Sequence, residues 1–268
     1  MVENTDKLKD QVFVYTDSKL YFEDPVDATD KALELMNRLI EDRPDYKWLR
    51  MQRAYVYFLK SDFKKANDNF AVYVRKSEAL FHNLCLKYAP KVREDGKLGI
   101  EDLLSMLQTL VENSYLTQAL MIASHDSVTR SSLDERLQMM KLLLSAANLQ
   151  WRGELTYDKK TAALKISGSH LNVLGIKQKW AIDNSSVCLI NLVPVKKLDL
   201  SGTEIYSLKY LSQLPLLEEL DVSSTLVYDL RPLGILKSLK KLIISPKQFP
   251  AKKIIGDMKD FQVVIKKE

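Results

Sequence analysis

A 22-residue repeat in the C-terminal third is the feature that most constrains this chain. The stretch VKKLDLSGTEIYSLKYLSQLPL, residues 195–216, is followed directly by LEELDVSSTLVYDLRPLGILKS, residues 217–238. A third start, LKKLIIS, follows at the same spacing. One unit of this length cannot bury its own apolar side, so neighbouring units are expected to stack and share a continuous core.

Seven positions match between the two complete units. They are Leu198, Leu200, Thr203, Ile205, Leu208, Leu211 and Leu214 in the first unit, and Leu220, Val222, Thr225, Val227, Leu230, Leu233 and Leu236 in the second. The L-x-x-L-x-L spacing is the sequence mark of a leucine-rich repeat, in which each unit is a short strand, a turn and a return segment. The threonines stand where many such repeats place Asn, and their hydroxyls can bond to the turn backbone.

Both ends of this array have candidate caps. Upstream, ALKISGSHLNVL (163–174) matches the repeat, and an insert at 175–186 interrupts it. Alternating apolar residues around a DKK turn predict a hairpin over 155–166. At the other end Phe249, Ile255 and Met258 fall on repeat positions, and FQVVI (261–265) is expected to form the last strand.

Residues 28–148 have a different period. Apolar residues recur at three and four, which is helical. Residues 34 apart also agree: Ala32 with Ala66, Met36 with Phe70, and Leu39 with Tyr73. The pattern A-x-x-Y then F-x-x-A-x-x-x-F within 47–76 resembles a tetratricopeptide repeat, with Ser61 in place of the usual turn glycine. The preceding unit keeps only its second helix, because VFVYTDSKLYF (12–22) fits the first poorly.

Further helices are expected near 77–92, 100–112, 115–124 and 132–148, the last one capped by Ser131 or Ser132. The expected fold class is α + α/β. An N-terminal helical, tetratricopeptide-like domain over 1–150 precedes a short, capped leucine-rich-repeat solenoid over 151–268. The boundary is placed at 149–154, and Trp151 is expected to pack between the two parts.

Composition favours a globular protein of a reducing compartment. The chain of 268 residues is 46% hydrophobic and 28% charged, which is ordinary for a packed domain. Its 2 cysteines, Cys85 and Cys188, do not make a disulfide framework. The N-terminus MVENTDKLKD has no signal-peptide pattern, and no apolar run reaches the roughly 18 residues of a membrane span. A cytoplasmic location without a membrane span is therefore expected.

Catalytic patterns are scarce, and we expect no catalytic, cofactor-binding or metal-binding residues. His82 and Cys85 share a helical face, but two ligands do not make a structural metal site. Ser124, His125 and Asp126 are consecutive, whereas a triad requires side chains that meet across space. The chain has 8 glycines and no glycine-rich phosphate loop. A non-enzymatic protein is the prediction.

The candidate binding residues lie on the expected strands. Between the inward leucines, Lys197, Asp199, Glu219, Asp221 and Lys241 should face outward. This mixed-charge row suits a protein or peptide partner, or ordinary solubility. We expect replacement of all five by alanine to change stability little.

In the helical part, Tyr55 and Phe58 could line a second groove, or pack against neighbouring helices. Their place on one face of a predicted helix fits either role. They therefore join the candidate partner-binding residues.

The motifs LDLSGTEIYSLKYL and LDVSSTLVYDLRPL, behind a tetratricopeptide-like segment, resemble the C-terminal portion of some large bacterial serine/threonine kinases. That resemblance implies a regulatory or partner-binding arm, although no kinase motif is present. Two other functions stay open: an enzyme with a site between the two parts, and nucleic-acid binding. The net charge of +5 is unevenly placed, with 13 Lys/Arg against 9 Asp/Glu in 195–268, but nucleic acid is the less favoured partner.

Overall fold

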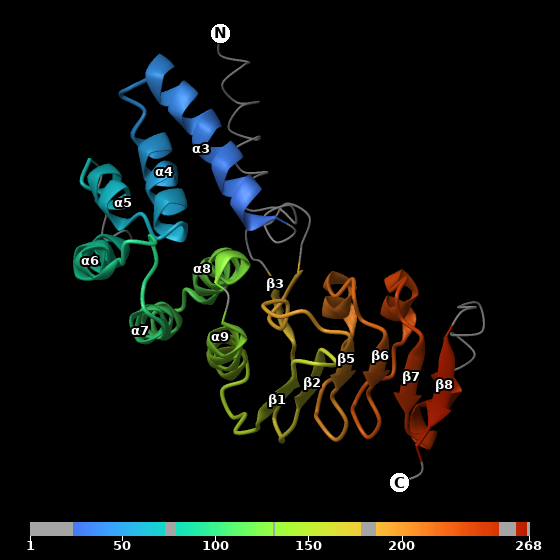
Figure 1. Ribbon diagram of the computed structural model, residues 1–268. Coiled ribbons are helices and arrows are strands. Elements are labelled where there is room, and N and C mark those ends of the chain that lie inside the picture. Colours follow the sequence, from blue (N-terminus) through green and yellow to red (C-terminus); the bar gives the residue numbers. More distant parts are fainter. Residues whose placement is uncertain (1–23, 73–78, 131, 178–185, 252–260, 267–268) are drawn as a thin grey trace. The chain divides into compact units, whose positions relative to one another are not determined.

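The computed structural model describes residues 24–72, 79–130, 132–177, 186–251 and 261–266. This part of the chain is mixed α/β: helices α3 to α9 come first, and strands β1 to β8 follow (Figure 1). The described residues fall into two compact units: the first ends at Glu135, and the second comprises the described residues from Arg136 onward. The division lies ahead of the expected boundary at 149–154, so most of α9 is counted with the sheet.

The first unit is helical. Its described elements are α3 (Pro25–Asp42), α4 (Lys47–Leu59), α5 (Phe63–Phe70), α6 (Ala79–Tyr88), a 3-10 helix (Ala89–Lys91), α7 (Ile100–Glu112) and α8 (Leu116–Thr129). Asp24 caps α3 by accepting the Asp27 N–H at 3.0 Å, and Asp62 caps α5 by accepting the Lys65 N–H at 3.3 Å. Such caps satisfy backbone donors that have no partner inside the helix.

The turn between α4 and α5 is as tight as the sequence pattern indicates. Ser61 has φ +60° there, a left-handed conformation that glycine adopts more readily than other residues. The helices expected near 77–92 and 100–112 are confirmed over the described residues, as α6 with the 3-10 helix that follows it and as α7. The helix expected near 115–124 is longer than expected, because α8 continues through Thr129.

An aromatic cluster fills the core of this helical unit. The Phe58 ring meets Phe63 and Phe81 edge to face, with centroids 5.3 Å apart in each pair. The Tyr55 ring meets Phe70 at 5.2 Å and Phe81 at 4.9 Å. Edge-to-face pairs are favourable beyond the apolar area that they bury. The aromatic residues of α4, α5 and α6 therefore pack with one another.

A buried ion pair ties the end of α8 to its neighbours. The Arg130 guanidinium donates from Nε and Nη2 to both carboxylate oxygens of Asp126. It also donates to Glu135 Oε2 at 2.8 Å and to the Leu98 carbonyl at 3.0 Å. Arg130 is 5% exposed and Asp126 is 7% exposed. A charge this deep is tolerated because its hydrogen bonds are satisfied.

The second unit holds most of α9 (Leu133–Ala147), which begins where Ser132 Oγ accepts the Glu135 N–H at 3.3 Å. Its strands are β1 (Leu155–Asp158), β2 (Ala163–Ile166), β3 (Gly175–Lys177), β4 (Ser186–Cys188), β5 (Lys197–Asp199), β6 (Glu219–Asp221), β7 (Lys241–Ile244) and β8 (Gln262–Ile265). The main sheet has the order β1-β2-β5-β6-β7-β8, and β3 pairs with β4 separately (Figure 1).

The register of the sheet follows the sequence repeat. Leu198 is the Cα partner of Leu220, and Leu220 is the partner of Leu242. The leucine of the upstream unit, Leu164, pairs with Leu198 in the same parallel sense. All four are at most 1% exposed. Equivalent leucines therefore stack into one core, as the 22-residue period predicts.

The expected strands at both ends are confirmed. β1 and β2 form the antiparallel hairpin, with Leu155 opposite Ile166. β8 pairs in parallel with β7 and ends the sheet. The ends of the 175–186 insert pair with each other as β3 and β4.

The turns that follow the strands account for the residues at two further positions of the repeat. Gly202 and Ser224, which are equivalent in the two units, both have positive φ, of 71° and 55°. Thr203 Oγ1 donates to the Leu200 carbonyl at 2.7 Å. Thr225 Oγ1 donates to the Val222 carbonyl at the same distance, 2.7 Å. The expectation that these hydroxyls bond to the turn backbone is confirmed.

The third unit departs from the pattern at Gln248, on the 3-10 helix after β7. Its side-chain nitrogen donates to the Val222 and Val227 carbonyls at 3.0 and 3.2 Å. Its side-chain oxygen accepts the N–H and O–H of Ser245, both at 2.9 Å. Gln248 is 3% exposed. One buried amide thus joins the last turn to the preceding unit.

Trp151 is buried inside the second unit. Its indole Nε1 donates to the Ser167 carbonyl at 2.9 Å, and a Cβ added at Gly153 or Gly168 would lie 2.2 or 3.2 Å from that nitrogen. The ring is 2% exposed. Contacts with the start of the repeat array therefore contribute to the burial of Trp151, and its expected place between the two parts stays a prediction.

Several expectations lie outside the described residues: those for 12–22, Tyr73, Ser131, the middle of the insert, Ile255 and Met258, as well as the Phe249 side chain. Within the part of the chain that is described, no helix has the length and apolar content needed to cross a membrane.

Candidate partner-binding face

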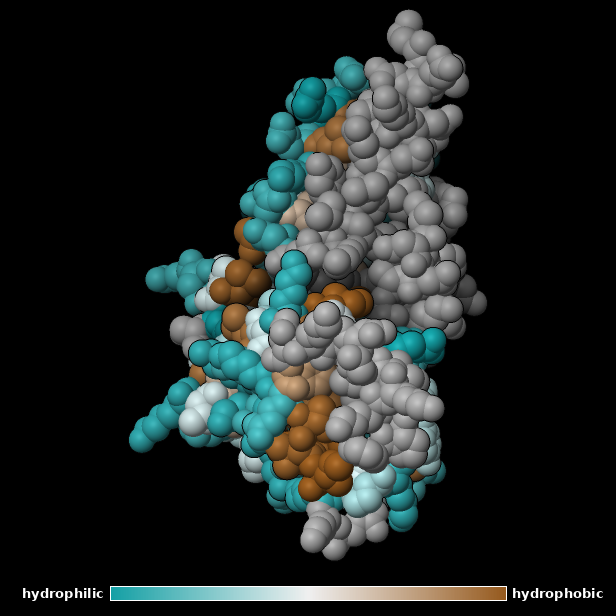
Figure 2. Space-filling view, turned by 90° about the vertical axis from the view of Figure 1, so that its right-hand side faces the viewer, coloured by the Kyte–Doolittle hydropathy of each residue, from teal (hydrophilic) through white to brown (hydrophobic). Residues whose placement is uncertain are grey.

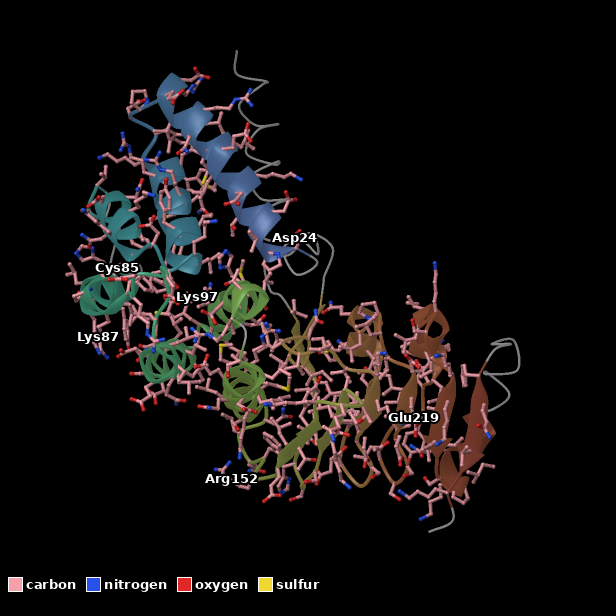
Figure 3. All side chains as sticks on the ribbon, viewed as in Figure 1. Asp24, Cys85, Lys87, Lys97, Arg152 and Glu219 are labelled. Carbon is pink, nitrogen blue, oxygen red and sulfur yellow. The ribbon has the colours of Figure 1, made fainter. Side chains whose placement is uncertain are left out.

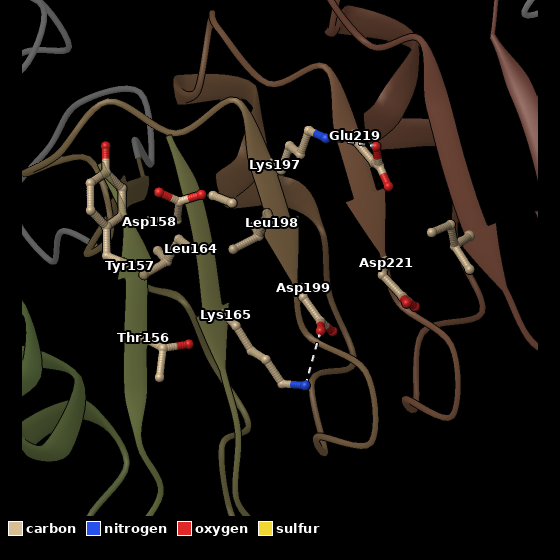
Figure 4. Close-up of a pocket in the computed structure, with 12 residues that line it drawn as sticks. Thr156, Tyr157, Asp158, Leu164, Lys165, Lys197, Leu198, Asp199, Glu219 and Asp221 are labelled. Atoms are coloured by element: carbon tan, nitrogen blue, oxygen red, sulfur yellow. Dashed lines mark ion pairs between the residues drawn. The ribbon is translucent and has the colours of Figure 1, made fainter. Parts of the chain in front are cut away.

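One face of the main sheet is hollowed and carries the charged residues singled out from the sequence. The hollow has a volume of about 470 Å³ (Figure 4). Its lining, which we call the charged sheet face, consists of Thr156, Tyr157, Asp158, Ala163, Leu164, Lys165, Lys197, Leu198, Asp199, Glu219, Asp221 and Ile243. Most of these side chains alternate along a strand with core residues, because successive residues of a strand point to opposite faces.

The first row of charges crosses three strands. Lys197, Glu219 and Lys241 are Cα partners on β5, β6 and β7. Glu219 lies 3.7 Å from Lys197 Nζ and 2.9 Å from Lys241 Nζ, and it is labelled in Figures 3 and 4. The structure therefore brings three of the predicted binding residues together as a Lys–Glu–Lys row.

A second row is more deeply set. Asp199 accepts the Ser201 N–H at 2.9 Å and lies 3.2 Å from Lys165 Nζ. Burial acts to raise the pKa of Asp199, but the Ser201 and Lys165 hydrogen bonds outweigh it, so this pKa is lowered. Asp221 accepts the Ser223 N–H and O–H at 2.9 and 2.6 Å. Both carboxylates therefore hold the turn that follows their own strand.

The expectation that all five strand charges are exposed is wrong for Asp221, which is 8% exposed. Its carboxylate also lies 3.4 Å from Lys266 Nζ, beyond β8. An alanine there would leave the Ser223 hydroxyl and backbone N–H without their acceptor, and such a loss is destabilising when the groups are buried. Asp221 therefore has a structural role in the turn after β6, which sets it apart from the other four candidate partner-binding residues of the strands.

The helical candidates differ from each other in burial. Phe58 is 1% exposed and packs inside the aromatic cluster, so it is unable to line a groove. Tyr55 is half-buried, with its ring on Phe70 and Phe81. The alternative of packing against neighbouring helices accounts for Phe58, because an aromatic residue on this face of α4 meets α5 and α6.

The second unit also exposes apolar side chains, whose chemistry differs from that of the charged sheet face. They include Tyr206, Leu226, Tyr228, Ile235 and Ile265. Figure 2 views the molecule from the side of the β8 edge and shows apolar side chains gathered there. Most of the exposed apolar residues lie outside strands, whereas the charged sheet face is built on them.

The thiols are held in their protonated form. Cys85 on α6 (Figure 3) and Cys188 on β4 are both buried, and burial raises the pKa of each thiol to about 12. A thiol is a poor nucleophile and metal ligand until it ionises. Among the described residues, no group of three or more His, Cys, Asp or Glu side chains is placed to hold a metal ion.

Ser124, His125 and Asp126 lie within α8, where consecutive residues point in different directions. The Asp126 carboxylate is engaged by Arg130. His125 Nε2 is buried and finds no hydrogen-bond partner in the described part of the chain. Burial, with a smaller contribution from Lys60, lowers the pKa of His125 to about 4, while Asp126 and Asp30 oppose the shift.

The neutral His125 makes the stability of the first unit dependent on pH. The His125 pKa of about 4 in the folded protein lies below its ordinary value of 6.5. Between these values the unfolded chain binds more protons, so stability falls as pH is lowered from 6.5 towards 4. The whole shift corresponds to about 3 kcal/mol. Urea unfolding at several pH values should reveal this loss.

Comparison with a His125→Gln variant isolates the contribution of this residue from that of the carboxylates. The stability of the wild type relative to the variant should decrease by about 2–3 kcal/mol between pH 7 and pH 4.5. A difference that stays constant over this range would show that His125 titrates normally.

In comparisons with known proteins, no family model, no curated protein and no solved structure matches this chain. The geometry of its own surfaces is therefore the basis for a function.

Proposed function

We propose that this chain is a non-enzymatic protein–protein interaction module that binds a protein or peptide segment on the charged sheet face. In this proposal residues 151–268 form a short, capped leucine-rich-repeat solenoid, and tetratricopeptide-like helices precede it. The leucine-rich-repeat assignment is supported by strands that are spaced at the repeat period and paired in register. The buried Ala54 and Ala66 and the positive φ of Ser61 support the tetratricopeptide-like assignment.

The Lys–Glu–Lys row is the observation that carries the binding proposal. Lys197, Glu219 and Lys241 pair with one another across strands, and their side chains are 52%, 27% and 36% exposed. Exposed ion pairs contribute only about 0–1 kcal/mol each. A partner with complementary charges can therefore replace these pairs at little loss of stability to the module.

The size of the hollow suits a peptide. Its lining comes from β1, β2, β5, β6 and β7. Neighbouring strands lie about 4.8 Å apart, so the five strands extend over roughly 19 Å, which matches about six residues of an extended peptide. Side chains of both signs line this length, so a segment of mixed charge is the expected partner.

Site-specific photocrosslinking followed by a binding measurement tests the proposal. A crosslinking amino acid at Lys197 should capture a defined partner from an extract of the native source, and the same amino acid at the exposed Lys237 should not. The purified partner is then titrated against a charge-inverted module carrying Lys197→Glu, Glu219→Lys and Lys241→Glu. The row keeps its alternating signs, so stability should hold while the dissociation constant rises at least tenfold, about 1.4 kcal/mol.

Lys237→Glu is the matched control for the binding measurement. Each Lys→Glu change alters the net charge by −2 and Glu→Lys by +2, so the triple variant and the control both shift it by −2. The control should bind like the wild type. Equal capture at both positions, or an unchanged dissociation constant for the triple variant, would contradict a role for the charged sheet face.

The kinase resemblance implies a narrower form of this function, in which the module is a regulatory arm of a signalling kinase. The crosslinked partner tests it directly. A kinase domain or its substrate among the captured proteins would support that setting, and a partner unrelated to phosphorylation would exclude it without affecting the binding proposal.

A further inference from the structure

A guanidinium group in the helical unit is held in place by neutral side chains. Arg53 on α4 donates from Nε to Asn69 Oδ1 on α5 at 2.9 Å and from Nη1 to Asn37 Oδ1 on α3 at 2.8 Å. Asn69 is 7% exposed and is itself fixed, because its Nδ2 donates to the Lys65 carbonyl at 2.8 Å. Side chains from three helices thus orient one partly buried cation.

Arg53 has no counter-ion in the part of the chain that is described. None of the ion pairs found there includes it. Burial lowers the pKa of Arg53, Tyr57 raises it, and the like charge of Arg50 lowers it further. No carboxylate of the described residues contributes to this shift. By contrast, the buried Arg130 of the same unit pairs with Asp126 and Glu135.

A second cation lies on the same side of α4. Arg50 precedes Arg53 by three residues, a spacing that puts two side chains on one helix face. Arg50 Nε donates to the Pro44 carbonyl at 3.2 Å, again a neutral acceptor. A guanidinium has five N–H donors, and Arg53 uses two of them on the asparagines. No hydrogen bond from Arg53 Nη2 is formed within the described residues.

We propose that Arg53 and Arg50 form a binding site for the carboxylates of an acidic peptide segment in a partner protein. The planar fork of a guanidinium matches a carboxylate, which can accept two parallel hydrogen bonds. Asn37 and Asn69 fix the Arg53 fork before the ligand arrives, and this reduces the entropy lost on binding. Charge complementarity defines the occupant, since an acidic side chain supplies the missing counter-ion.

The site lies in the helical unit, on α3, α4 and α5, whereas the charged sheet face lies in the other unit. The inference therefore goes beyond the proposed function and does not depend on it. A chain with both surfaces would engage an acidic segment and a mixed-charge segment separately.

Fluorescence anisotropy with a fluorescein-labelled decaglutamate peptide tests the site in the full chain at low ionic strength. The informative variant is Asn37→Asp, which places a carboxylate beside Arg53 Nη1 as an internal competitor. This variant should melt at the same temperature as the wild type or higher, because it gains an ion pair, and should bind decaglutamate at least tenfold more weakly. Arg53→Gln should weaken binding by a similar factor.

Asn113→Asp is the matched control, since Asn113 is exposed at the end of α7 in the same unit and the change in charge is identical. It should alter binding less than twofold. Equal weakening by Asn37→Asp and Asn113→Asp would show that decaglutamate senses only net charge, and this would overturn the proposal.

Two further outcomes would also overturn it. One is wild-type binding that Asn37→Asp leaves unchanged. The other is loss of decaglutamate binding in the charge-inverted sheet variant but not in Asn37→Asp, which would move acidic recognition to the sheet. Unlabelled decaglutamate and inorganic phosphate can also be compared as competitors. If phosphate displaces the labelled peptide at a lower concentration than decaglutamate does, a carboxylate site is excluded.

Discussion

Replacement of Arg130 by alanine is expected to lower the free energy of unfolding by about 3–5 kcal/mol. The guanidinium makes hydrogen bonds to Asp126, Glu135 and the Leu98 carbonyl. The Asp126 side chain is buried, 7% exposed, and removal of the guanidinium takes away the cation that pairs with its carboxylate. Leaving a charge buried and unpaired is far more destabilising than removing an ion pair as a whole.

Urea unfolding followed by circular dichroism measures this loss. A double variant, Asp126→Asn with Arg130→Met, removes both charges and should recover a substantial part of the stability. Arg38→Ala is the control, because its pair with Glu34 is exposed, with side chains 73% and 71% accessible. If Arg130→Ala and Arg38→Ala unfold at the same urea concentration, the buried network contributes nothing.

Leu220→Ala is expected to destabilise the second unit by about 2–5 kcal/mol. Leu220 is 0% exposed and lies between Leu198 and Leu242 in the stacked core. Alanine would leave a cavity between Leu198 of the preceding repeat and Leu242 of the following one. These leucines are held by their own strands, so they cannot move easily to fill the cavity. The lost area and the residual cavity both reduce stability.

Glu219→Ala, one residue earlier, is the natural comparison. That side chain points to the opposite face and is 27% exposed, so its loss should change stability by about 1 kcal/mol or less. The same chemical denaturation experiment serves both variants. Equal losses would mean that the inward and outward faces of β6 are assigned the wrong way round.

Contacts between equivalent positions of the repeat, and contacts within a single turn, were the most predictable from the sequence. The pairing of Leu198 with Leu220 and Leu242 follows from a 22-residue period, because identical units stack with identical positions side by side. The same pattern placed Lys197, Glu219 and Lys241 in one row on the outer face. The hydroxyl contacts of Thr203 and Thr225 were also predictable, since they are made within one turn.

The sequence pattern gave no signal for contacts between positions that do not repeat. Gln248 reaches 26 residues back to Val222, and no equivalent glutamine exists in the other units. Asp221 has the same outward register as Asp199 but is 8% exposed, and its carboxylate contacts the Ser223 hydroxyl and Lys266 on the far side of β7.

The sequence by itself determined the order of the strands, their register and which faces of them are apolar, because periodic side chains leave a repeat unit only one way to bury its leucines. Tertiary structure alone decided the rest. Arg53 meets Asn37 and Asn69, each 16 residues away, and Phe58 is enclosed by rings from α5 and α6. Such contacts depend on how helices cross, and helix crossing is set by the packing of all their side chains together, which no local pattern records.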